Sequence, residues 1–158
     1  MNIFVISDDY VECAIALDDK RLVKMCVEST QMLSTAISIH GGHPVYSAAW
    51  HKHPCTIWTA KTRSNFIWHM NLLKAMGQEF EYRYGKKHKS VEDGIKLIDQ
   101  VHMIPEGPLT TFANCSLYKG DIHVIDAYRK TMIDKWNNDK RTPKWSKRKI
   151  PLWATGEK

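Results

Sequence analysis

Two long segments of helical periodicity, residues 19–40 and 57–84, constrain the fold of this chain more than any other feature. In each, apolar and small residues recur every three or four positions, which places them along one stripe of an α-helix. Glycines follow both segments and favour a helix end at each place. Two helices of this length predict an all-α protein. The stripe in 19–40 consists of Leu22, Met25, Cys26, Ser29, Met32, Leu33, Ala36 and Ile37.

Shorter elements are expected to fill the rest of the chain. The stretch "NIFVIS" predicts a short extended start, after which Ser7 or Asp8 can cap a helix. No linker or internal repeat divides the 158 residues, so we expect a single domain over 1–158, a compact helical bundle. The expected elements are an extended start over 2–7, helices over about 8–17, 90–101 and 121–136, and an irregular stretch over 104–120.

The C-terminal segment, residues 137–158, is basic and aromatic. Six of the ten residues 140–149 are Lys or Arg, and the net charge of the chain is +6. Such cations neutralise phosphates, and interleaved tryptophans offer faces to unpaired bases. We predict duplex DNA as the partner, while a solvated tail or tryptophans that dock the tail onto the core remain open. The predicted DNA contacts here are Arg141, Lys144, Trp145, Lys147 and Arg148.

Other features bear on location and cofactors. No apolar run approaches the roughly 20 residues that span a bilayer, and the start lacks the layout of a secretory signal. We therefore expect a cytoplasmic monomer, in the host cytoplasm if the chain is phage-encoded, with no membrane contact. The widely spaced cysteines are expected to be reduced thiols, with no metal and no cofactor. These cysteines are Cys13, Cys26, Cys55 and Cys115.

Histidines at four nearby positions raise the question of a metal site. The spacings HxxH and HxH could supply ligands, but loop histidines often cap helices or face solvent, and we predict no metal. His69, on an apolar face, is expected to be a hydrogen-bonded core residue. Glu79 and Arg83 are expected to form an i,i+4 bridge on the surface. The four nearby histidines are His40, His43, His51 and His53.

Glu28 lies on the edge of the first helical stripe, together with Lys24 and Arg21. The pattern fits a salt-bridged helix flank. It also fits a carboxylate that stabilises developing positive charge, with Arg21 and Lys24 shaping the charge around it. The helical pattern does not choose between the two.

The segment "DKRLVKMCVE", residues 19–28, resembles the first core helix of the bacteriophage pyrimidine-dimer DNA glycosylases, the endonuclease V type enzymes. In that family an aspartate opens the helix and the catalytic glutamate follows nine residues later, as Asp19 and Glu28 do here. The stretches "KHPCT", "LLKAMGQEFEYRYG" and "RTPKW" resemble further family segments, in order. The start also looks like a group of small phage and bacterial proteins.

The resemblance implies a compact all-α enzyme that acts on DNA without a metal. In the family, the N-terminal α-amine attacks C1′ of the damaged nucleotide, expels the base and forms a Schiff base that permits strand cleavage. Glu28 would be the catalytic carboxylate. The amine would belong to Met1, because methionine is normally retained before a side chain as large as Asn2. The family's helix histidine is Arg21 here, and the arginine before its glutamate is Val27.

We therefore predict a DNA N-glycosylase, with possible AP-lyase activity, acting on damaged or modified pyrimidines in duplex DNA. The predicted catalytic residues are Glu28, Met1 and Arg21, and Lys24 and His53 join the tail among the DNA contacts. Two alternatives stay open. One is an enzyme of the same fold that acts on another N-glycosidic substrate, such as a nucleotide or a modified base. The other is a non-enzymatic phage protein that binds nucleic acid.

Overall fold

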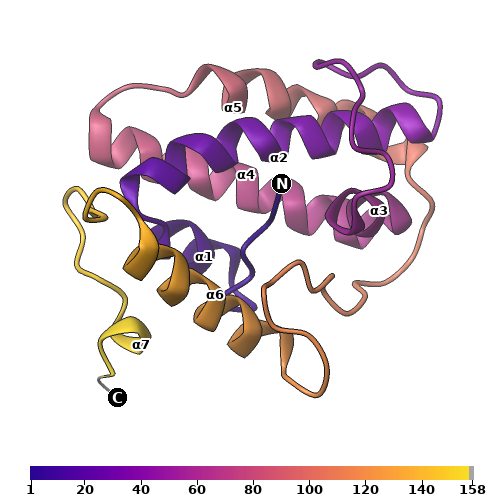
Figure 1. Cartoon of the computed structure of the whole chain (residues 1–158). Coiled ribbons are helices and arrows are strands. Elements are labelled where there is room, and N and C mark those ends of the chain that lie inside the picture. The colour runs from indigo at the N-terminus through magenta and orange to yellow at the C-terminus, as the bar shows by residue number, and fades with distance from the viewer. Residues whose placement is uncertain (157–158) are drawn as a thin grey trace.

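Two long antiparallel helices, α2 (Asp19–Ile39) and α4 (Arg63–Tyr84), form the centre of the fold in the computed structural model (Figure 1). The structure describes residues 1–156, and within that range every regular element is helical. The all-α prediction is confirmed, and the bounds of α2 agree with the stripe in the sequence. The other elements are α1 (Tyr10–Ala16), α3 (Pro54–Lys61), α5 (Lys89–Gly94), the 3-10 helix η1 (Ile95–Met103), α6 (Val124–Asn138) and α7 (Leu152–Thr155).

The predicted helix over 57–84 is two helices, α3 and α4, separated at Thr62. Thr62 has φ −136° and ψ 154°, and its side chain accepts a hydrogen bond from the Asn65 backbone N–H, which makes it the N-cap of α4. The Thr62 hydroxyl also donates to the carbonyl of Pro108 at 2.9 Å. Apolar residues continue across the break with helical spacing, so periodicity alone gave no sign of it.

The shorter helices differ from prediction mainly at their starts. Helix α1 begins at Tyr10 with Asp9 as its N-cap, in place of Ser7 or Asp8. Helix α5 begins at Lys89 and passes into η1, and α6 begins at Val124, three residues after the expected start at 121. Helix ends are the least regular parts of such elements, and these shifts leave the arrangement of the bundle unchanged.

The N-terminal segment, residues 2–6, is buried against the bundle, but it is not extended throughout as expected, because Phe4 has a φ of 43°. Asn2 fixes it: its side-chain carbonyl accepts from the backbone N–H groups of Ile3 and Phe4, and its amide nitrogen donates to the carbonyl of Cys115 at 3.1 Å. On the other side, Arg129 Nε donates to the Ile6 carbonyl at 2.9 Å. These contacts hold the chain terminus in one place beside α2 (Figure 1).

The C-terminal segment docks onto the bundle as far as residue 156, and its last two residues lie outside the described range. Trp145 Nε1 donates to the Ala16 carbonyl at 2.9 Å, and its ring packs edge-on against Trp136. The Trp153 ring stacks on the Trp136 ring, with the two ring centroids 5.6 Å apart. Trp136, Trp145 and Trp153 thus form one aromatic cluster. The structure therefore supports the alternative in which tryptophans dock the tail onto the core.

Glu79 and Arg83 form a buried network, which corrects the expectation of a surface bridge. The side chain of Arg83 is 0% exposed and that of Glu79 is 4% exposed. Arg83 also donates to Asp19 at 3.0 Å and to the carbonyls of Leu17 and Ile15. Arg148 from the tail contacts both oxygens of Glu79, so the network joins α1, α2, α4 and the tail.

This network predicts a loss of stability in acid. Burial acts to raise the pKa of Glu79, but hydrogen bonds from Arg148 and Arg83 outweigh it, and the pKa is lowered. A lowered folded-state pKa contributes stability that is present above the unfolded value, about 4.3, and is lost as the pH falls through the folded value. We expect the free energy of unfolding in urea to fall below about pH 4.3, and to fall less steeply in Glu79→Gln. An equal slope in both proteins would contradict this assignment.

Two further features complete the fold. His69 is fully buried between Thr59 Oγ1, at 2.7 Å from Nδ1, and Ser29 Oγ, at 2.9 Å from Nε2, which confirms a hydrogen-bonded core histidine. Burial lowers the pKa of His69 to about 3, so the ring is neutral at pH 7. Among the described helices, none combines the length and the apolar character that crossing a membrane requires.

Candidate functional site

The N-terminal amine and the Glu28 carboxylate lie together at the middle of α2. The Met1 nitrogen is 3.2 Å from Glu28 Oε1, and the two side chains are only 7% and 15% exposed. Lys24 Nζ lies 3.8 Å from Glu28 Oε2. This second oxygen is buried and has no hydrogen-bond donor within residues 1–156. One face of the carboxylate is thus engaged by the amine, while the other retains unused acceptor capacity.

Local sequence explains why Glu28 is held at this place. Its neighbours Met25 and Ser29 are buried in the core, whereas Val27 on the other side is exposed, so Glu28 sits on the border of the apolar stripe. A carboxylate on such a border loses part of its hydration, which strengthens its interaction with a nearby cation. The Met1 amine supplies that cation, because Asn2 anchors the chain immediately after it.

His53 is the third member of this group. Its Nδ1 accepts from the Cys55 backbone N–H at 3.1 Å, which caps α3, and its ring also hydrogen-bonds to the Met1 backbone. Burial and the positive amine lower the pKa of His53, while Glu28 and the Met1 backbone act in the opposite direction. The imidazole is therefore neutral at pH 7. His53, expected among the DNA contacts, lies beside the amine, where it can position Met1.

Arg21 has a different environment from the one expected of it. Its guanidinium contacts Asp139 at 2.8 and 3.0 Å and Asp18 at 3.3 Å, and Trp136 Nε1 donates to Asp18. These bonds join the start of α2 to the end of α6. Arg21 is seven residues, or about 10.5 Å of helix, before Glu28. The structure therefore gives Arg21 a role in packing the bundle and does not bring it to the Met1–Glu28 pair.

The predicted DNA contacts of the tail divide into two groups. Arg148 is engaged by Glu79 and lies over the Tyr82 ring at 4.3 Å, and Lys147 donates to the Tyr82 carbonyl at 3.0 Å. Trp145 is packed in the aromatic cluster. Arg141 and Lys144 are exposed, as is Lys24 on α2. Arg141 and Lys144 form the second group, whose charged side chains face solvent.

The tail contacts the start of α2, the helix that carries Glu28. The Asp19 backbone N–H donates to the Lys144 carbonyl at 2.8 Å, and Ser146 bonds to the Asp19 carboxylate. Asp19 and Glu28 are nine residues apart on α2, about 13.5 Å along its axis. Lys20 and Lys24 project from the helix between them and are largely exposed. Two exposed lysines of α2 therefore lie between the tail contact at Asp19 and Glu28.

A thiol pair lies next to His53. Cys55 Sγ and Cys115 Sγ are 2.8 Å apart, and the ligand atoms of His53, Cys55 and Cys115 all lie within 4.8 Å of one another. The hydrogen bond from Cys55 lowers the pKa of Cys115, whereas burial raises the pKa of Cys13 and Cys26 to about 12. Sequence spacing gave no sign of this group. Its ligand types suit a soft cation, but Nδ1 of His53 already accepts a hydrogen bond from the Cys55 backbone N–H.

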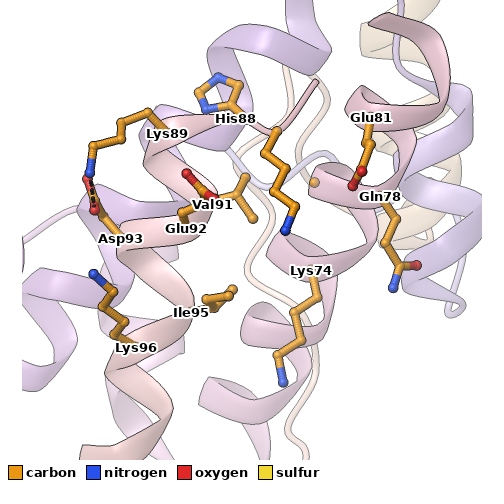
Figure 2. Close-up of a pocket in the computed structure, with 12 residues that line it drawn as sticks. Lys74, Gln78, Glu81, His88, Lys89, Val91, Glu92, Asp93, Ile95 and Lys96 are labelled. Carbon is orange, nitrogen blue, oxygen red and sulfur yellow. Dashed lines mark hydrogen bonds and ion pairs between the residues drawn. The ribbon is translucent and has the colours of Figure 1, made fainter. Parts of the chain in front are cut away.

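A groove lies elsewhere, between α4 and the α5–η1 segment (Figure 2). It has a volume of about 570 Å³, and lysines and acids alternate on its walls. Lys89 and Asp93 pair across one wall at 2.6 Å. None of the residues of the Met1–Glu28 site lines this groove. Its mixed charge and lack of buried polar groups give it no specific chemistry, and we place the candidate site at Met1 and Glu28.

The arrangement at Met1 and Glu28 can support nucleophilic chemistry. Once it has given up its proton, an amine forms Schiff bases with carbonyl-level carbons. A carboxylate beside it can accept the amine's proton and stabilise positive charge on a sugar. The sequence pointed to both residues. It did not show that they touch, or that His53 lies beside Met1, because these residues are far apart in the chain.

Comparison with known proteins identifies a family. A family model described as pyrimidine dimer DNA glycosylase matches residues 1–93, which is more than half of the chain and includes Met1, Glu28 and His53. No curated protein and no solved structure matches the chain.

Proposed function

Because this chain belongs to the pyrimidine dimer DNA glycosylase family, we propose that it releases a damaged or modified pyrimidine from duplex DNA with Met1 and Glu28 as its catalytic residues. The contact of 3.2 Å between the Met1 amine and Glu28 Oε1 carries the proposal. This contact brings together a nucleophile and a proton acceptor that are 27 residues apart in the chain. Both lie in a half-buried position. The exposed cations of α2 and of the tail can provide phosphate contacts.

The first step is displacement of the base. Glu28 takes a proton from the amine, and the nitrogen lone pair forms a bond to C1′ of the sugar. The bond between C1′ and the base breaks, and the base leaves with its electron pair and gains a proton. The Glu28 carboxylate stabilises the positive charge that develops on the sugar as the base departs. The base must leave the helical stack for the amine to reach C1′.

The second step gives the covalent intermediate and the lyase activity. The C1′–O4′ bond opens, O4′ takes the electron pair and a proton, and the nitrogen forms a double bond to C1′. This protonated Schiff base acidifies C2′. Loss of the C2′ proton then lets the C3′–O bond break, with the phosphate leaving on its electron pair. His53 acts by holding Met1 in position, because its ring contacts the Met1 backbone.

The proposal is tested by incubating the protein with ultraviolet-irradiated, uracil-containing and abasic duplexes in the presence of borohydride. We expect base release from at least one damaged duplex, and a reduced covalent adduct whose peptide map places the DNA on residue 1. Base release without an adduct would remove the amine mechanism and leave a hydrolytic glycosylase. In a pyrimidine dimer the cleaved base stays bonded to its neighbour, so cleavage there is scored after photoreversal. An absence of glycosidic-bond cleavage in every duplex would overturn the proposed function.

A further inference from the structure

Trp50 is the one tryptophan that residues 1–156 leave exposed, with 63% of its surface accessible. Trp58, Trp68 and Trp136 are buried, and the two tail tryptophans pack against the core. A tryptophan carries a large apolar surface, and its exposure gives up the free energy that burial would supply. The ring is therefore accessible to a binding partner.

The backbone at Trp50 holds the ring outward. Its φ of 59° is in the left-handed region, which a bulky residue rarely adopts. The loop before it is fixed to α2: Thr35 Oγ1 donates to the Ala49 carbonyl at 2.8 Å and accepts from its N–H, and Gln31 Nε2 donates to the Ser47 carbonyl. Strain of this kind persists only where the surroundings impose it, and it is concentrated at functional sites.

The same loop connects Trp50 to the Met1–Glu28 pair. Gln31 and Thr35 follow Glu28 on α2 by three and seven residues, about 4.5 and 10.5 Å along the axis. At the other end of the turn, the His53 N–H donates to the Trp50 carbonyl at 3.0 Å, and the His53 ring contacts Met1. Trp50 is therefore fixed on both sides: the loop before it is bonded to α2, and its own carbonyl is bonded to His53, whose ring contacts the Met1 backbone.

We propose that Trp50 stacks on the unpaired base at the opened step of the DNA and so holds the helix open while C1′ faces the Met1 amine. The inference rests on the proposed function, because base extrusion is what creates an unpaired base. Aromatic rings bind unpaired bases through their faces irrespective of sequence. Lys52, two residues after Trp50, and Lys24 on α2 are exposed and can engage phosphates of the same DNA. Trp145, expected from sequence to stack or wedge, is committed to the core.

The test compares Trp50→Asn and Trp50→Tyr with wild type. Asparagine tolerates the left-handed backbone and removes the ring, while tyrosine keeps an aromatic face. The probes are an intact duplex and a duplex with an uncleavable tetrahydrofuran abasic analogue. We expect Trp50→Asn to raise the Kd for the abasic duplex by about 5- to 150-fold, with a much smaller change for the intact duplex. Trp50→Tyr should recover most of the loss, and Leu117→Asn, at an equally exposed loop position, should have no effect.

The outcomes separate this inference from the proposed function. If Trp50→Asn binds the abasic duplex as tightly as wild type does, the stacking role is wrong. This holds even if base release shows that the enzyme acts on DNA. An equal loss of affinity for both duplexes would also overturn it, since it would indicate general contact. If wild type releases no base, the proposed function fails, and a Trp50-dependent preference for the abasic duplex would still support stacking. Thermal unfolding of each variant checks that the fold is kept.

Discussion

Glu28→Gln is expected to lower the rate of base release by about 10²- to 10⁴-fold, the range for loss of a positioned proton-transfer group. Glutamine has the size and polarity of the native side chain but cannot take a proton from the Met1 amine, and it carries no charge to stabilise the sugar. DNA affinity should change little, because Glu28 is half-buried and the exposed cations remain. The measurement is single-turnover base release, with Kd determined separately.

Glu81→Gln is the matched control, since it makes the same chemical change at an exposed position of α4. It should leave base release and DNA affinity as in wild type. Base release by Glu28→Gln at the wild-type rate would exclude Glu28 as the catalytic carboxylate. A large loss of DNA affinity or of melting temperature in Glu28→Gln would instead show that its ion pair with Met1 serves mainly to hold the site together.

Moving the amine away from Glu28 is expected to abolish the borohydride-trapped adduct. An N-terminal extension that ends in a protease site directly before Met1 replaces the free amine by an amide, which is not nucleophilic. Base release should fall by at least about 100-fold, the lower end of the effect of losing a catalytic group. The trapped adduct is measured by mass spectrometry, and base release by chromatography on the same samples.

The extension carries its own control, because cleavage at the protease site restores the free amine of Met1 in the same protein preparation. Adduct formation should return with cleavage and follow its extent. If the uncleaved protein forms the adduct as well as the cleaved one, the nucleophile is another amine, and the contact between Met1 and Glu28 is a structural ion pair. DNA affinity before and after cleavage shows whether the extension merely blocks the substrate.

The predictions from sequence were accurate where they depended on neighbours along one helix. The stripe over 19–40 gave the bounds of α2 and placed Glu28 on its border, because side chains three and four residues apart share a face. The same reasoning missed the break at Thr62, since the periodicity is unchanged across it. There the decisive contacts come from Pro108 and Asn65, and one of these is 46 residues away.

The tail shows a second limit of sequence patterns. Its charge and aromatic content describe equally a DNA-binding arm and a segment that packs on its own protein. The structure assigns Arg148 to Glu79 and Trp145 to the Ala16 carbonyl, and leaves Arg141 and Lys144 exposed. Composition cannot make this division, because a guanidinium or an indole has the same formula whether its partner is DNA or protein.

The sequence by itself determined that the chain is helical, that α2 carries Glu28 at the edge of its buried stripe, and which family the chain resembles. These properties follow from local spacing and from residues in register. Only the tertiary structure decided what surrounds Glu28: the Met1 amine at 3.2 Å, His53 from the start of α3, and a loop that turns Trp50 outward. Such contacts join residues distant in the chain, and packing of the whole bundle selects them.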